Sequence, residues 1–112
     1  MSEIRLSKSF SKQFADLQIR AENGEGDANY ILKLIEKGIS TLVNDRESGN
    51  KIQKNIWPNY YSKKFEISNL WRLRLDKSWK MIYTIIGDDV RIVTIVLDVL
   101  NHKKHNKMFG YK

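Results

Sequence analysis

The feature that most constrains the fold is a pair of alternating segments around a short polar turn, in the stretch NLWRLRLDKSWKMIYTI at residues 69–85. Apolar and polar residues alternate in both segments, as in strands that bury one face, and Asp76–Ser78 suits a hairpin loop. A slip of one residue would mix charged and apolar side chains on each face, so one register is favoured. The predicted cross-strand pairs are Leu75–Trp79, Arg74–Lys80, Leu73–Met81, Arg72–Ile82 and Trp71–Tyr83.

This register gives the hairpin one apolar face, suited to packing on helices, and one basic face with Arg72, Arg74 and Lys80. Like charges directly opposite each other on neighbouring strands destabilise a sheet by up to roughly 1 kcal/mol. A bound phosphate would reverse the sign of this contribution, because the planar fork of arginine matches phosphate oxygens. The alternative interpretation is an ordinary solvated sheet face.

Shorter patterns predict the elements before the hairpin. The segment EIRLS alternates apolar and polar residues, which predicts a short strand. Two helices should follow as an antiparallel hairpin, the first capped by Ser7 or Ser9, the second capped by Asp27 and ending near Gly49. The apolar faces of the two helices are Phe10, Phe14, Leu17 and Ala21, and Ile31, Leu34, Ile35, Ile39, Leu42 and Val43.

A third strand is predicted over residues 90–99, followed by a tail, NHKKHNKMFGYK, that forms a short helix or an extended segment. With GD as a two-residue turn, Ile82 lies opposite Val93. Aliphatic residues of the third strand then share the basic face, so something apolar must cover part of it. The candidates are the C-terminal segment, through Met108 and Phe109, and an amphipathic helix of a partner.

These patterns predict an α+β fold in one domain, residues 1–112: an N-terminal strand, an antiparallel helix hairpin packed on a mainly antiparallel sheet of about four strands, and a short C-terminal segment. The chain contains no cysteine, which excludes disulfides and thiolate metal sites and fits a reducing cytoplasm. No apolar run reaches the roughly 18 residues of a membrane span. We therefore expect a cytoplasmic protein without a signal peptide or a membrane partner.

The net charge of +7 is placed unevenly along the chain. Residues 1–50 carry seven Lys and Arg against eight Asp and Glu, whereas residues 51–112 carry thirteen against five. Such an excess points to an anionic partner. The connector KIQKNIWPNYYSKKFEIS interleaves lysines with aromatic rings, which suits single-stranded RNA because its bases stack on rings.

The stretch NLWRLRLDKSWKMIYTIIGDDVRIVTIVLDVLNHKKH, residues 69–105, resembles the RelE/ParE toxin superfamily. Those proteins typically have an aromatic-then-basic strand, a strand similar to YRIVY, an acidic turn, and an aliphatic strand that runs into GHR. The predicted order of strand, helix hairpin and three antiparallel strands is also similar to that family. The resemblance implies a toxin of a type II toxin–antitoxin pair, neutralised by an acidic antitoxin protein.

Within that superfamily the RelE-like branch cuts mRNA without a metal, usually on the ribosome, whereas the ParE-like branch inhibits DNA gyrase. We expect an endoribonuclease acting on mRNA and the ribosome. The alternatives are a gyrase inhibitor and a non-catalytic member that binds nucleic acid or a partner. The catalytic positions that the resemblance implies are Arg72, Arg74, Lys80, His102 or Lys103, and Tyr111.

Metal-free cleavage would use the 2′-hydroxyl of RNA as nucleophile, and it needs groups that move protons and stabilise negative charge. Arginine effectively keeps its proton, so Arg72 and Arg74 are expected to clamp phosphate rather than act as a base. Histidine is the side chain whose ordinary pKa lies near neutrality, and the chain has two, His102 and His105. The lesser candidates for proton transfer are Glu66, Tyr111, Lys80 and Lys103.

The motif HKKH that contains both histidines also has an alternative interpretation, a solvated polar turn after a strand. No carboxylate clusters with it in the sequence, so we expect neither a metal nor another cofactor. The antitoxin is expected to cover the basic face and the apolar strip of Ile82, Val93 and Ile95. The lysines expected to bind RNA are Lys51, Lys54, Lys63, Lys64, Lys103 and Lys104.

Overall fold

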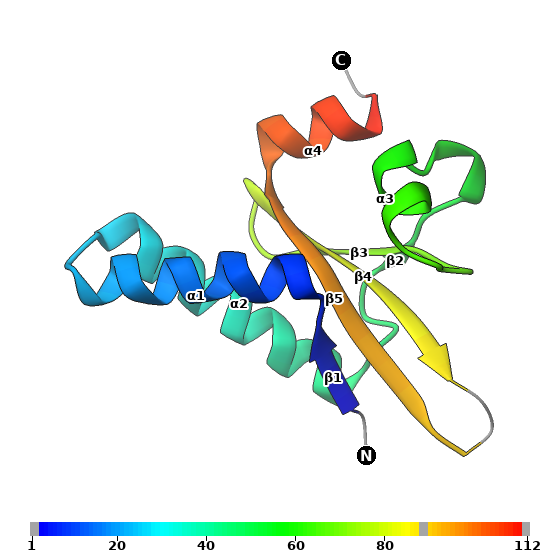
Figure 1. The fold of residues 1–112 in the computed structure, drawn as a ribbon, viewed down its shortest axis with the longest axis horizontal. Helices are drawn as coiled ribbons and strands as arrows, with labels where there is room; N and C mark the ends of the chain where they lie inside the picture. Colours follow the sequence, from blue (N-terminus) through cyan, green and yellow to red (C-terminus); the bar gives the residue numbers. More distant parts are fainter. Residues whose placement is uncertain (1–2, 88–89, 111–112) are drawn as a thin grey trace.

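A five-stranded sheet lies between two groups of helices in the computed structural model, which describes residues 3–87 and 90–110 (Figure 1). The strands are ordered β1-β5-β4-β3-β2 across the sheet. Along the chain the elements are β1 (Glu3–Leu6), α1 (Lys8–Glu22), α2 (Gly26–Asn44), β2 (Asn50–Lys51), the 3₁₀ helix η1 (Lys54–Ile56), α3 (Asn59–Lys64), β3 (Trp71–Arg74), β4 (Trp79–Gly87), β5 (Ile92–Asn101) and α4 (His102–Phe109).

The predicted α+β class, N-terminal strand and mainly antiparallel sheet are confirmed. β1 is the exception to the antiparallel order, because it runs parallel to β5 with Glu3 opposite Val93. The expected sheet of about four strands has five in the described residues, and the additional strand is β2. β2 pairs with β3 through Asn50 and Arg72, and a two-residue polar strand has no periodicity by which it could be recognised.

The hairpin of β3 and β4 has the predicted register. Its loop is closed by Asp76, whose Oδ1 accepts hydrogen bonds from the backbone N–H groups of Ser78 at 2.7 Å and Trp79 at 2.8 Å. An aspartate that bonds the backbone two residues further on favours a tight turn. The confirmed pairs are Trp71–Tyr83, Arg72–Ile82, Leu73–Met81 and Arg74–Lys80.

The pairing of β4 with β5 differs from the prediction, because Ile82 lies opposite Asp98 rather than Val93. One cause is the turn. Gly87 still pairs with Ile92 in the sheet, so GD does not form a two-residue loop. The other cause is a shift of register next to Ile82, of the kind that a β-bulge produces. Alternation of apolar residues does not reveal a bulge in advance.

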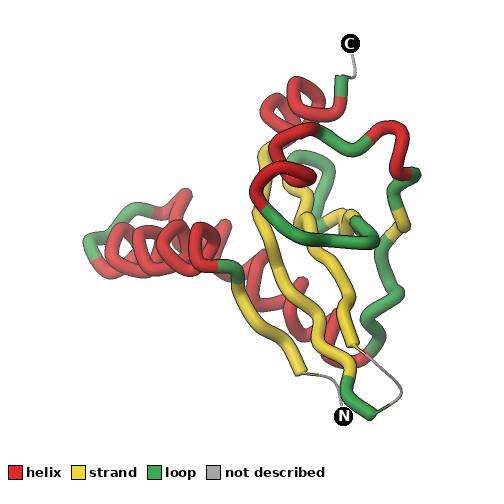
Figure 2. Tube along the Cα trace, turned by 45° about the vertical axis from the view of Figure 1, so that its right-hand side comes forward, coloured by secondary structure: helices red, strands yellow, loops and turns green. Residues whose placement is uncertain are grey.

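The helices α1 and α2 form the predicted antiparallel hairpin on one face of the sheet (Figures 1 and 2). Ser7 caps α1, since its Oγ accepts a hydrogen bond from the N–H of Phe10 at 3.1 Å. The prediction that Asp27 caps α2 is wrong, because the cap is Glu25 and its side chain makes no capping bond. Asp27 lies in the first turn instead, where a negative charge favours the helix dipole.

Gly49 does not end α2, which stops at Asn44, but it allows the chain to approach the sheet closely. Its N–H donates to Tyr83 Oη at 3.1 Å. A Cβ at this position would lie 2.5 Å from the carbonyl oxygen of Arg72 and 2.6 Å from Tyr83 Oη. A side chain does not fit there, so glycine is what lets β2 run alongside β3.

Each face of the sheet carries a hydrophobic core. The core under α1 and α2 contains Leu73, Met81 and Tyr83, as predicted for the apolar face of the hairpin. The opposite face carries a second core beneath α3, α4 and the connector, so the predicted cover by Phe109 and Met108 is confirmed. We call this second set the connector core: Ile52, Tyr61, Leu70, Ile82, Leu97, Leu100 and Phe109.

Candidate functional site

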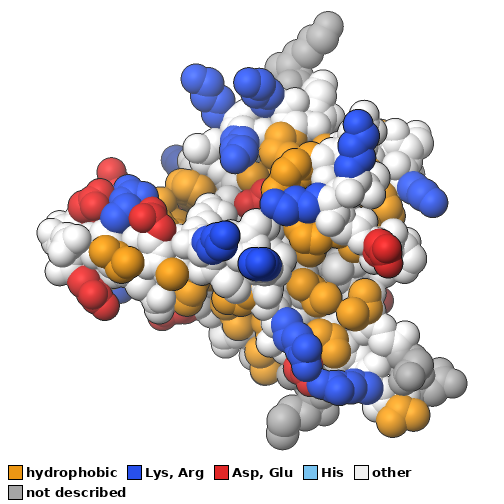
Figure 3. Space-filling view, in the orientation of Figure 1, with side chains coloured by type: hydrophobic (Ala, Val, Ile, Leu, Met, Phe, Trp, Pro, Cys, Tyr) orange, Lys and Arg blue, Asp and Glu red, His pale blue; other side chains and the backbone are white. Residues whose placement is uncertain are grey.

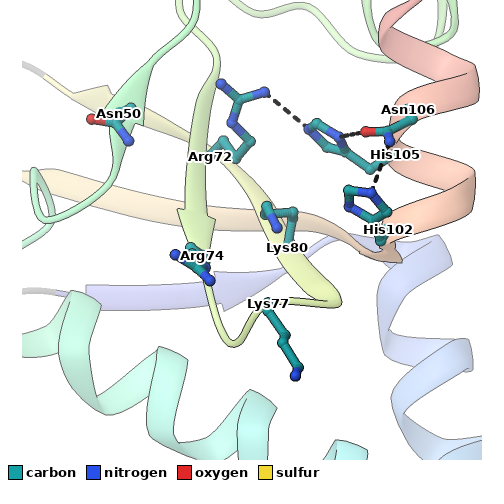
Figure 4. Close-up of a pocket in the computed structure, with 8 residues that line it drawn as sticks. All are labelled: Asn50, Arg72, Arg74, Lys77, Lys80, His102, His105 and Asn106. Atoms are coloured by element: carbon teal, nitrogen blue, oxygen red, sulfur yellow. Dashed lines mark hydrogen bonds between the residues drawn. The ribbon is translucent and has the colours of Figure 1, made fainter. Parts of the chain in front are cut away.

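An open basin of about 360 Å³ lies between β3, β4 and α4 (Figure 4). The basic face of the β3–β4 hairpin contributes cationic side chains, and the beginning of α4 contributes two imidazoles and an amide. We call this the basic basin. The side chains that line it are Asn50, Arg72, Arg74, Lys77, Lys80, His102, His105 and Asn106.

The strand side of the basic basin follows from the two-residue period of a strand. Arg72 and Arg74 are two residues apart on β3, so both side chains point away from the helix hairpin. Lys80 lies opposite Arg74 on β4, and Asn50 of β2 lies opposite Arg72. Four residues from three strands therefore share one face.

The helix side of the basin depends on where α4 begins. β5 ends at Asn101, whose Oδ1 accepts a hydrogen bond from the N–H of Lys104 at 2.8 Å and so caps α4. Residues three and four apart share one side of a helix, which places His105 and Asn106 next to His102. The cap thus fixes which side chains of α4 reach the strands.

Arg72 is held by two side chains of α4. Its Nη1 lies 3.0 Å from Nε2 of His105, and its guanidinium lies over the ring of Phe109 at 5.7 Å. The rings of His105 and Phe109 stack with centroids 4.6 Å apart. Because a guanidinium only donates hydrogen bonds, Nε2 of His105 is the acceptor in this contact.

Asn106 bridges the two histidines of the basin. Its Oδ1 lies 3.2 Å from Nδ1 of His105, and its Nδ2 lies 3.0 Å from Nε2 of His102. His105 is buried with 2% of its surface exposed, whereas His102 is exposed. A continuous series of hydrogen bonds therefore joins Arg72 to a solvent-facing imidazole (Figure 4).

The basic basin carries an excess of positive charge, which a bound anion would neutralise. In the described part of the chain, no Asp or Glu lines it. Burial lowers the pKa of Lys80, and the charges of Arg74 and Arg72 lower it further. Burial also lowers the pKa of His105, and Arg72 and Lys80 add to this effect against an opposing hydrogen bond with Asn106. A phosphate bound next to them would raise the pKa of both groups, because a nearby anion favours the protonated forms.

The carboxylate of Asp76, in the hairpin loop, compensates the charge of the basin only in part, since it raises the pKa of Lys80 against the larger effects of burial, Arg74 and Arg72. Its Oδ2 accepts a hydrogen bond from Tyr30 Oη at 2.6 Å, and its Oδ1 is engaged by the loop backbone. These bonds, with Tyr30 first, lower the pKa of Asp76 against a smaller effect of burial. Asp76 is thus committed to holding the hairpin loop against α2.

The family model for the ParE toxin of the type II toxin-antitoxin system, parDE, matches residues 4–105. The chain belongs to this toxin family. The fold is also similar to the solved structure of a YoeB/ParE toxin from Agrobacterium tumefaciens, at 14% sequence identity with a TM-score of 0.56. That similarity covers 89% of this chain and 98% of the other. No curated protein sequence matches the chain.

In this toxin, four of the residues implied by the superfamily resemblance lie together. Arg72, Arg74, Lys80 and His102 all line the basic basin. Tyr111 lies outside the described residues. The remaining candidates for proton transfer lie elsewhere, since Glu66 lines a different hollow and Lys103 lines one on the other side of α4.

The lysines expected to bind RNA are spread around the toxin rather than gathered in the basin. Lys103 and Lys104 lie on α4, and Lys51 lies on β2. Lys64 of α3 donates to Tyr60 Oη at 2.9 Å and lies over the Tyr60 ring. Figure 3 shows Lys and Arg side chains distributed over several parts of one face. Of the connector aromatics, Tyr61 is fully buried in the connector core, so its ring is not available to stack on a base.

Asn50, Lys77 and Asn106 are residues of the basin that the sequence did not indicate. Asn50 belongs to a strand too short to show a pattern. Asn106 follows His102 by four residues, so a helical interpretation of the tail would have placed the two side by side. His105 was a candidate through its chemistry alone, and the structure adds its contact with Arg72.

Two general properties of the described residues bear on the chemistry. In residues 3–87 and 90–110, no three His, Cys, Asp or Glu side chains gather closely enough to hold a metal ion. No described helix is long and apolar enough to cross a membrane.

Proposed function

We propose that the toxin is an endoribonuclease that cuts mRNA, in the cytoplasm and on the ribosome, without a metal ion. The observation that carries this proposal is the basic basin itself, in which three cations from paired strands face two histidines. A phosphodiester is the anion that such a set fits, because arginine binds phosphate oxygens in a bidentate manner and imidazole moves protons near neutral pH.

In the proposed reaction the 2′-oxygen of a ribose attacks the adjacent phosphorus, and the bond from phosphorus to the 5′-oxygen breaks. The products are a 2′,3′-cyclic phosphate and a 5′-hydroxyl. The proton lost by the 2′-hydroxyl passes to a base, and the 5′-oxygen gains a proton. Arg74 and Lys80 would hold the phosphate from opposite strands and stabilise the charge that develops on it.

His102 is the proposed proton-transfer group. It is exposed at the edge of the basin, whereas His105 is buried and bound through both ring nitrogens. Lys80 is a second candidate, since its lowered pKa increases the fraction that is neutral. Arg72 and Arg74 are assigned to phosphate binding because they cannot give up a proton.

The test is cleavage of ribosome-bound and free mRNA by the wild type and by the variants Arg74→Ala and His102→Gln, across pH and in the presence of a chelator. We expect Arg74→Ala to lose a few kcal/mol of transition-state stabilisation, about what removal of one charge-stabilising donor costs. His102→Gln should retain RNA binding, slow cleavage and flatten its dependence on pH. Lys33→Ala, at an exposed lysine of α2 outside the basin, is the control.

The second candidate function is inhibition of DNA gyrase. The match to the ParE family model favours it, because the ParE-like branch of the superfamily is the one that the resemblance associates with gyrase. A supercoiling assay with purified gyrase distinguishes the two functions. A toxin that stops supercoiling but leaves all RNA intact is a gyrase inhibitor, and the assignment of the basic basin to RNA cleavage is then wrong.

Membership of a toxin–antitoxin family implies an antitoxin partner, and we propose that an acidic segment of it docks on the β5 side of the sheet. Ile82 cannot take part as expected, since it is fully buried in the connector core. Val93 and Ile95 line an open hollow beside β1, rimmed by Arg5 and Arg91. Both arginines form ion pairs with Glu3 at 2.6 Å, and two positive charges against one negative charge leave this rim net positive. Figure 3 shows apolar side chains between cationic ones on this face. An amphipathic acidic segment matches both features.

A further inference from the structure

The hydrogen bonds that link Arg72 to His102 have a fixed direction. Arg72 can only donate, so Nε2 of His105 accepts, and a neutral His105 carries its proton on Nδ1. That N–H donates to Oδ1 of Asn106, so the amide nitrogen of Asn106 faces His102. An amide nitrogen only donates, so Nε2 of His102 accepts and a neutral His102 also carries its proton on Nδ1.

We propose that Asn106 is a positioning residue of the toxin, whose amide fixes on which ring nitrogen each of the two basin histidines holds its proton. The inference rests on the proposed ribonuclease function only for its consequence in catalysis. The placement of the protons itself depends on three contacts of 3.0, 3.2 and 3.0 Å between described side chains.

This arrangement decides what His102 can do in the free toxin. In the free toxin Nε2 of His102 is occupied by the amide of Asn106, so His102 offers a ligand the N–H at Nδ1 and can accept the proton of the 2′-hydroxyl only after Nε2 has released the amide. A second proton on Nε2 of His102 would turn this nitrogen from an acceptor into a donor. It would then face the amide nitrogen of Asn106, which is also a donor, and the hydrogen bond between them would be lost. Asn106 thus acts on the reaction through His102 without touching the RNA itself.

Arg72 sets the direction of the series, and Arg72 is also a proposed phosphate ligand. A phosphate oxygen that takes the N–H of Arg72 leaves Nε2 of His105 without that donor. His105 can then bind a proton at Nε2 and donate it to the same phosphate. The burial and surrounding positive charge that lower its pKa in the free toxin would be offset by the bound anion.

The isosteric variant Asn106→Asp tests this proposal, because it should change the position of the proton on His102 but not on His105. A carboxylate only accepts hydrogen bonds, so His105 should keep its proton on Nδ1, whereas His102 should move its proton to Nε2 or become doubly protonated. The chain has only two histidines, so long-range ¹H–¹⁵N spectra of the imidazoles identify each proton position directly, without RNA.

Two further variants make the spectra decisive. Asn106→Ala removes both contacts, so His102 should lose its preference while His105 keeps its proton on Nδ1 through Arg72. Lys107→Gln, at the next residue, lowers the net charge by the same one unit as Asn106→Asp and should leave both rings as in the wild type. If His102 in Asn106→Asp still holds its proton on Nδ1 alone, the positioning role is excluded.

The consequence for activity is measured separately. In Asn106→Asp the new negative charge favours protonated imidazole, so the acidic limb of the cleavage profile should move to higher pH by about one unit. Lys107→Gln should keep the wild-type profile. A wild type that cuts no RNA overturns the proposed function and leaves the spectra as the test of Asn106. If the toxin cuts RNA but the proton positions of its histidines do not change with substitutions at residue 106, only the positioning role is wrong.

Discussion

Arg74 and Arg20 are arginines in opposite electrostatic surroundings. Arg74 lies across a strand pair from Lys80, whereas Arg20 forms ion pairs with Asp16 at 3.8 Å and Glu25 at 3.1 Å. Substitution by glutamine should therefore raise the free energy of unfolding at position 74, by about 0.5 kcal/mol. The same change should lower it at position 20, by at most about 1 kcal/mol. Urea denaturation of the two variants at low salt measures both effects.

The physical cause of that difference is tested by salt and by phosphate. High salt should shrink both changes, because it screens exposed charges. A saturating phosphate analogue should reverse the order at position 74, since the wild type then gains a ligand contact that the variant lacks. A less stable Arg74→Gln at low salt would contradict this prediction and show that the hydrogen bond from Arg74 Nε to the carbonyl oxygen of Asp76, at 3.3 Å, outweighs the repulsion.

His105 should make the toxin less stable as the pH decreases. Its pKa in the folded toxin is lowered from the ordinary value of 6.5, mainly by burial. The unfolded chain therefore binds a proton that the folded toxin does not, and stability falls as pH decreases through 6.5 towards the lower folded value. His105→Gln keeps an acceptor for Arg72 and should flatten this slope. Subtracting the two stability profiles cancels the contributions of other groups, and equal slopes would contradict the prediction.

At the level of elements, two buried threonines on neighbouring strands should respond in opposite ways to valine. The hydroxyl of Thr84 on β4 donates to the backbone oxygen of Asn69 at 2.7 Å. The hydroxyl of Thr94 on β5 has no hydrogen-bond partner among the described residues. Thr94→Val should therefore stabilise the toxin by about 1 kcal/mol, and Thr84→Val should destabilise it by a similar amount.

Thermal and urea unfolding of the two valine variants compare these effects directly. The pair is matched, because both side chains are almost completely buried in the same sheet. Thr94→Val that is less stable than the wild type would mean that its hydroxyl has a water partner. The hydroxyl of Thr94 would then belong to a structural water site under the helix hairpin.

The individual helices and strands also show which elements the sequence could predict and why. Alternation around Asp76 determined the β3–β4 register because a one-residue slip would have buried Arg74, a large penalty visible from local residues alone. The β4–β5 register depended on a bulge beside Ile82, which has no signature in the residue pattern. α3 could not be predicted either, since its six residues begin after Pro58 and are stabilised mainly by burying Tyr61.

The residues of the candidate site likewise divide into those that the sequence could place and those that it could not. Arg72, Arg74 and Lys80 share a face through strand geometry, which sequence spacing reveals. Asn50 and Asn106 reach the basin only because β2 and α4 are brought to it by tertiary packing. Long-range placement of this kind depends on the close approach at Gly49 and on the connector core, and neither leaves a local pattern.

At the scale of the whole molecule, the uneven charge predicts how the toxin meets its antitoxin. Residues 51–112 carry thirteen Lys and Arg against five Asp and Glu. The association rate with an acidic antitoxin segment should therefore fall steeply with ionic strength, by an order of magnitude or more between low and physiological salt. Stopped-flow association at several salt concentrations measures this. Ile86→Ser should mainly raise the dissociation rate, because Ile86 lines the same hollow as Val93 and Ile95 and is 42% exposed, so it can contact the antitoxin directly.

An association rate that does not change with salt would contradict electrostatic steering, and unchanged dissociation in Ile86→Ser would place the antitoxin elsewhere. The matched control is Val43→Ser on α2, an exposed valine distant in sequence from the proposed contact. It should leave both rate constants as in the wild type.

The parallel pairing of β1 with β5 has a consequence for how the toxin folds during translation. Glu3 pairs with Val93, so β1 can join the sheet only after β5 has been synthesised. Contacts this distant in sequence form late and slowly. The basic basin also needs β5 to end before α4 can be placed. A chain that has been synthesised only as far as β4 therefore lacks both the β1–β5 pair and the complete basic basin.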